Sequence, residues 1–66
     1  MKVFLNGHER DITSPATLAH LLEQAGFGGR RVAVEVNREI VPRSSYDCRD
    51  LAAGDQIEIV HAIGGG

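Results

Sequence analysis

The sequence predicts one α+β domain, a mixed sheet of four to five strands with a single helix packed on one face. Two observations favour this class: short segments at both ends and in the middle of the chain alternate apolar and polar residues, and one segment repeats its apolar residues at helical spacing. A helix with one apolar stripe has to cover a sheet face. The 66 residues suffice for one domain with a small core.

The chain opens with a predicted hairpin. Residues 1–6 alternate in polarity, and Asn6-Gly7 is a strong signal for a two-residue turn, which needs positive φ at both central positions. The returning segment, residues 8–12, offers only Ile12 as a strong core residue. We therefore expect it at an edge of the sheet, where charged residues block unwanted pairing.

The helix follows a Thr-Ser-Pro-Ala-Thr stretch. Its N-cap is either Ser14 or, as we favour, Thr17. Gly26 is expected to end the helix in the left-handed conformation, with Phe27 folding back onto the last turn. The apolar stripe comprises Leu18, Leu21, Leu22 and Ala25.

The second half of the chain contains three more strand segments. Residues 32–37 alternate, Asn37-Arg38 is a second tight turn, and residues 39–41 form a short strand that Pro42 stops. Residues 44–48 show no period and predict a 3₁₀ or irregular turn, and residues 53–55 a turn before the last strand, which starts at Gln56.

The first and last strands are the most apolar on the helix-facing side, so we expect them side by side at the centre. The residues predicted to form the core between the helix and this face of the sheet are Val3, Leu5, Ile12, Leu18, Leu21, Leu22, Val32, Val34, Val36, Val41, Leu51, Ile57 and Ile59. Phe4 and Val60, with Ala33 nearby, fall on the opposite face, which nothing in a one-helix chain covers. Such a patch is typical of a protein interface.

Composition excludes several functional classes. A formal net charge of −2 argues against nucleic acid as a partner, and no apolar run is long enough to span a membrane. Lys2 is not followed by the apolar segment of a secretory signal. The single cysteine, Cys48, has no partner for an internal disulfide, which favours a reducing compartment. We expect a cytoplasmic protein.

No catalytic or metal-binding constellation is present. His8, His20 and His61 fall on different elements without metal-ligand spacing, and Cys48 has only Arg49 as a neighbouring cation. We therefore expect no catalytic residue, no metal and no bound cofactor. The remaining reactive group is the terminal carboxylate of Gly66, at the end of a slim tail formed by Gly64, Gly65 and Gly66. We predict a folded domain over residues 1–63 and a flexible tail over 64–66.

Four segments of the chain resemble the ThiS family of sulfur carriers, which have the β-grasp (ubiquitin-like) fold. They are residues 1–7, 17–22, 32–43 and 51–60, the last running on to the glycines. The most specific is Val-Asn-x-Glu-x-Val-Pro-Arg, which here begins at Val36. The resemblance covers essentially the whole length.

The resemblance implies a strand order of 2-1-5-3-4, with the first and last strands parallel. It also implies that an E1-like, ThiF-like enzyme uses ATP to adenylate the Gly66 carboxylate, which then becomes a thiocarboxylate with sulfur drawn from cysteine by a desulfurase. A ThiG-like thiazole synthase would receive the sulfur for thiamine biosynthesis, and the free carrier would be a monomer. Two alternatives stay open: a MoaD-like carrier for molybdopterin synthesis, and a ubiquitin-like interaction module with an inert tail.

Overall fold

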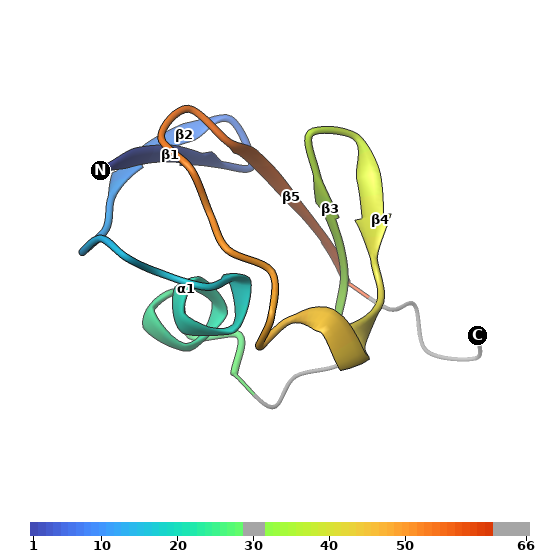
Figure 1. The fold of residues 1–66 in the computed structure, drawn as a ribbon. Helices are drawn as coiled ribbons and strands as arrows, with labels where there is room; N and C mark the ends of the chain where they lie inside the picture. Colours follow the sequence, from blue (N-terminus) through green and yellow to red (C-terminus); the bar gives the residue numbers. More distant parts are fainter. Residues whose placement is uncertain (29–31, 62–66) are drawn as a thin grey trace.

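The computed structural model describes residues 1–28 and 32–61, and it shows a five-stranded mixed sheet with one helix against one face (Figure 1). The strand order is β2-β1-β5-β3-β4, with β1 and β5 parallel and the other neighbours antiparallel. This confirms the predicted order and the central position of the first and last strands. The elements are β1 (Lys2–Leu5), β2 (His8–Asp11), α1 (Leu18–Gln24), β3 (Val32–Val36), β4 (Glu39–Val41), the 3₁₀ helix η1 (Arg43–Ser45) and β5 (Gln56–His61).

Both predicted tight turns are present, and both have positive φ at their two central residues. In the β1–β2 turn, φ is 52° at Asn6 and 82° at Gly7. In the β3–β4 turn, φ is 52° at Asn37 and 69° at Arg38. Type I′ turns of this kind match the twist of the strands that they join. Arg38 occupies a conformation that non-glycine residues seldom adopt, so the flanking strand pairs must hold it there.

The helix begins and ends as predicted. Thr17 is the N-cap, and its hydroxyl oxygen accepts a hydrogen bond from the backbone N–H of His20 at 3.2 Å. At the other end Gly26 has φ of 86°. The backbone N–H of Phe27 donates to the carbonyl of Leu22 at 2.8 Å, as in a Schellman motif.

The core lies between α1 and the helix-facing side of the sheet. Twelve of the thirteen predicted core residues are buried, and Val32, the other one, is half-buried and packed against them. Ala16, which was not predicted, is also buried. Its carbonyl accepts a hydrogen bond from the N–H of Leu51 at 2.9 Å, so the segment before the helix and the segment before β5 close this side of the core together.

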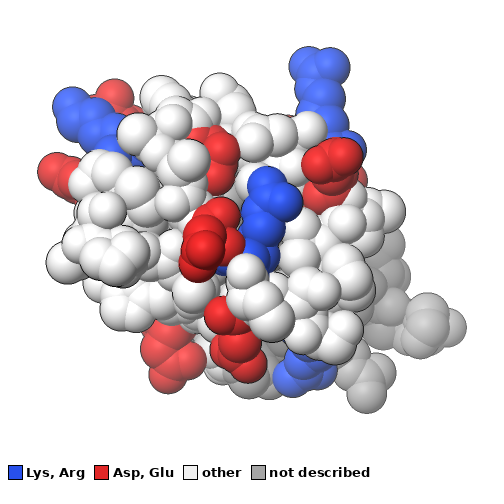
Figure 2. Space-filling model, viewed as in Figure 1, with Lys and Arg blue, Asp and Glu red and all other residues white. Residues whose placement is uncertain are grey.

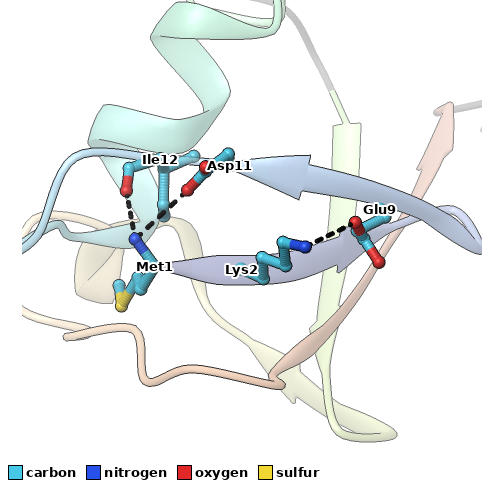
Figure 3. Close-up of polar contacts among 5 residues, drawn as sticks. All are labelled: Met1, Lys2, Glu9, Asp11 and Ile12. Atoms are coloured by element: carbon cyan, nitrogen blue, oxygen red, sulfur yellow. Dashed lines mark hydrogen bonds and ion pairs between the residues drawn. The ribbon is translucent and has the colours of Figure 1, made fainter.

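The start of the chain is fixed to the edge strand by polar contacts (Figure 3). The Met1 ammonium donates to the carbonyl of Ile12 at 2.7 Å and lies 3.3 Å from an Asp11 carboxylate oxygen. On the exposed side, Lys2 and Glu9 form an ion pair at 3.2 Å. These contacts hold the β1–β2 hairpin in register, and β1 in turn positions β5.

Candidate functional site

The predicted site lies at the end of β5, the strand at the centre of the sheet. β5 pairs with β3 from Val36 opposite Ile57 to Val32 opposite His61. The predicted reactive residues, Gly64, Gly65 and Gly66, lie outside the described residues. The structure therefore defines the strand that leads to them and the surface around it.

The Asn37 side chain forms hydrogen bonds at the start of β5. Its side-chain carbonyl accepts the backbone N–H of Gln56 at 3.0 Å, and its side-chain N–H donates to the Asp55 carboxylate at 3.0 Å. The other carboxylate oxygen of Asp55 accepts the N–H of Ala52 at 2.8 Å. One side chain of the β3–β4 turn thus joins the turn that precedes β5 to the strand itself.

Asn6 forms hydrogen bonds to the middle of β5 from the β1 side of the strand. Its backbone N–H donates to the carbonyl of Ile57 at 2.8 Å, and its side-chain oxygen accepts the N–H of Ile59, also at 2.8 Å. Both turn asparagines therefore have two functions: they accommodate positive φ, and they bind the main chain of β5. The sequence indicated the first function, but the second depends on strand register.

The predicted partner patch divides into two places on the uncovered face. Ala33 lies directly opposite Val60, whose side chain is 52% exposed. Phe4 is half-buried and lies beside Gln56, four residues earlier on β5, which corresponds to about 13 Å along the strand. The structure thus brings Ala33 and Val60 together and places Phe4 apart from them. Their role in binding stays a prediction.

Sequence reasoning missed Ile40, the most exposed large apolar side chain of the described residues, at 76%. It lies on β4 opposite Glu35, on the same face as Ala33 and Val60. The prediction that Val41 faces the helix is confirmed, and alternation along β4 places its neighbour Ile40 on the opposite face, so this signal could have identified Ile40. Ile40 extends the apolar part of this face toward the sheet edge.

The other candidate residues are dispersed. His8, His20 and Cys48 are exposed, and within residues 1–28 and 32–61 no three His, Cys, Asp or Glu side chains are grouped to hold a metal. The face in Figure 2 carries separate acidic and basic side chains rather than one continuous basic surface. No helix in the described ranges is long and apolar enough to cross a membrane. The strand leading to the C-terminus therefore remains the candidate site.

Comparison with known proteins identifies the family of the chain. The sequence model of the ThiS family matches residues 3–66, which include β5 and all three terminal glycines. The chain belongs to the ThiS family. Its fold agrees with the crystal structure of a thiamine biosynthesis protein (ThiS) from Geobacter metallireducens, with a TM-score of 0.87 at 26% identity over the full length of both chains. The β-grasp fold predicted from the sequence is confirmed.

Two kinds of ThiS-family relative are similar to the chain over all of its residues. The sulfur carrier protein ThiS of Escherichia coli is 30% identical over 66 residues, 100% of both chains. A thiazole synthase of Paramagnetospirillum magneticum is 48% identical over 66 residues, and one of Magnetococcus marinus 46%. The chain spans 20% of the length of each of these two synthases. In each of them, a region similar to this chain is part of a longer polypeptide.

Proposed function

We propose that this protein is a sulfur carrier for thiazole formation in thiamine biosynthesis and that Gly66 carries the sulfur. The observation that supports it best is the ThiS family match, which continues through the last residue of the chain. The relatives named as sulfur carriers and as thiazole synthases support the same pathway. The MoaD-like alternative has no comparable support among them.

The chemistry follows from the poor reactivity of a carboxylate. An E1-like enzyme joins the Gly66 carboxylate to AMP from ATP and releases pyrophosphate. A persulfide formed from cysteine by a desulfurase then attacks the adenylate and displaces AMP, which gives an acyl persulfide. A thiol reduces this acyl persulfide to the thiocarboxylate and is itself oxidised to a disulfide. Glycine has no Cβ, so Gly64, Gly65 and Gly66 form the slimmest main chain that can enter a partner's active site. In this scheme the carrier is a co-substrate, and its partners supply the catalytic groups.

The uncovered sheet face is proposed as the surface that the partners bind. Ala33 and Val60 form its apolar part nearest to the tail, and Phe4 a second apolar position. Val60 precedes Gly66 by six residues on the same strand and tail. A partner that holds this face therefore limits where the carboxylate can reach.

Intact mass after co-expression with the activating enzyme and the desulfurase tests the proposal. We expect a gain equal to the exchange of one oxygen for sulfur, located on the C-terminal peptide. A variant extended by one alanine after Gly66 is the matched control, because it keeps the folded domain and removes the glycine carboxylate. Equal sulfur gain in both chains would contradict the proposal.

The same experiment separates the alternatives. An inert interaction module would gain no sulfur, and deletion of Gly65 and Gly66 would leave its binding to partners unchanged. A carrier for molybdopterin synthesis would gain sulfur but would not support thiazole formation with purified thiazole synthase. Either outcome would overturn the assignment to thiazole biosynthesis.

A further inference from the structure

The C-terminal half of β5 has one strand edge that no strand of the described chain covers. β1 pairs with β5 only at Phe4 opposite Gln56 and Leu5 opposite Ile57, and the chain then turns away at Asn6. β5 continues to His61 with β3 alongside its other edge. Figure 1 shows β5 running on past the β1–β2 turn.

The hydrogen bonds show which main-chain groups point to this open edge. Gln56 and Asn37 bond across the β3 side, so the even-numbered residues of β5 point toward β3. The odd-numbered residues point toward β1: the carbonyl of Ile57 accepts the N–H of Asn6, and the N–H of Ile59 donates to the Asn6 side chain. By this alternation, the carbonyl of Ile59 and the N–H of His61 face the edge beyond Asn6.

We propose that an extended segment of thiazole synthase adds to this edge of β5 as a sixth strand, bonding to the Ile59 carbonyl and the His61 N–H. An open edge of this kind is a template for another strand, and main-chain bonds supply the affinity in such complexes. Gly66 follows His61 by five residues, so the added strand lies within a few residues of the proposed sulfur-carrying carboxylate in the sequence.

The identity of the partner rests on the proposed function and on the relatives. In two proteins named thiazole synthase, a domain 46–48% identical to this chain forms part of the synthase polypeptide. Covalent linkage raises the effective concentration of two domains that associate, and it is most useful where the direct contact is small. An edge with so few free main-chain groups is a contact of that size.

The substitution His61→Pro tests the proposal, because proline removes the N–H that faces the edge. This N–H does not take part in the pairing with β3, so the domain should remain folded. His61→Ala is the matched control: it removes the same side chain and keeps the N–H. We expect purified thiazole synthase to bind His61→Pro about fivefold or more weakly than His61→Ala, the effect of one buried acceptor left unpaired.

A second variant distinguishes loss of the N–H donor from an effect of proline on folding. Replacing the amide between Val60 and His61 by an ester removes the same N–H donor and keeps the His61 side chain. We expect this variant to bind about as much more weakly than the wild type as His61→Pro does than His61→Ala. Equal binding of the His61→Pro, ester and His61→Ala chains would overturn the proposal. The sulfur gain of the wild-type chain is measured separately, so loss of the edge contact is distinguished from failure of the carrier function itself.

Discussion

Glu35 on β3 lies directly opposite Glu58 on β5, so two acidic residues occupy opposed positions on the uncovered side of the sheet. Like charges at opposed positions destabilise a sheet. Neither residue forms an ion pair within the described part of the chain. The central strand pair that carries the site therefore has two like charges at opposed positions.

Replacing one of these carboxylates should stabilise the domain. We expect Glu58→Lys to raise the free energy of unfolding by about 0.5 kcal/mol, because an opposed pair of opposite charge replaces the repulsion. Glu58→Gln, which removes the repulsion alone, should fall between Glu58→Lys and the wild type. Urea unfolding at low and high salt measures both effects, and the gain should shrink as salt screens the charges. A gain that is independent of salt would contradict the electrostatic cause.

The dual function of Asn6 predicts a graded loss of stability. Asn6→Gly keeps the positive φ and removes the bond to the Ile59 N–H, which should cost about 1 kcal/mol. Asn6→Ala also loses this bond and places alanine in the left-handed region, which asparagine and glycine adopt more readily, so it should cost about 1 kcal/mol more than Asn6→Gly. Denaturant midpoints of the two variants test this order. Equal stability of Asn6→Gly and the wild type would mean that the side-chain bond contributes nothing.

Truncation of adjacent residues of β5 should cost very different amounts of stability. Ile59 is buried against the helix, so Ile59→Ala should cost about 3 kcal/mol. Val60 is on the uncovered face, and Val60→Ala should cost less than about 1 kcal/mol. Thermal or urea unfolding of this pair tests the register of the strand. A one-residue shift of β5 would exchange the two results.

Alternation and turn chemistry made most of the fold predictable. Val3, Leu5, Ile57 and Ile59 identify the buried side of the central strands by period alone, and Gly26 marks the end of the helix. Ala16 escaped prediction because it lies in a stretch without period before the helix, where burial depends on the later segment that ends at Leu51.

The candidate site was predictable in outline, and its geometry was not. The terminal glycines and the uncovered face follow from the sequence, but the separation of Phe4 from Val60 depends on where β1 leaves β5. The bonds of Asn6 and Asn37 to β5 join residues far apart in the chain, and they form only in the observed register. Long-range pairing of this kind has no local pattern in the sequence.

The position of Val60 beside the tail predicts a selective loss of function. Val60→Ser and Ile40→Ser both remove an exposed apolar side chain from the same face, so each should leave the unfolding midpoint nearly unchanged. Val60 lies on the strand that carries the tail, and Ile40 lies two strands away on β4. We therefore expect Val60→Ser to lower the rate of sulfur loading about fivefold or more, as for loss of a buried apolar contact at an interface, and Ile40→Ser to lower it less. Timed mass spectra of the C-terminal peptide measure both rates. An equal loss of loading rate in the two variants would show that the partner contacts the whole face. No loss in either variant would show that this face is not part of the site.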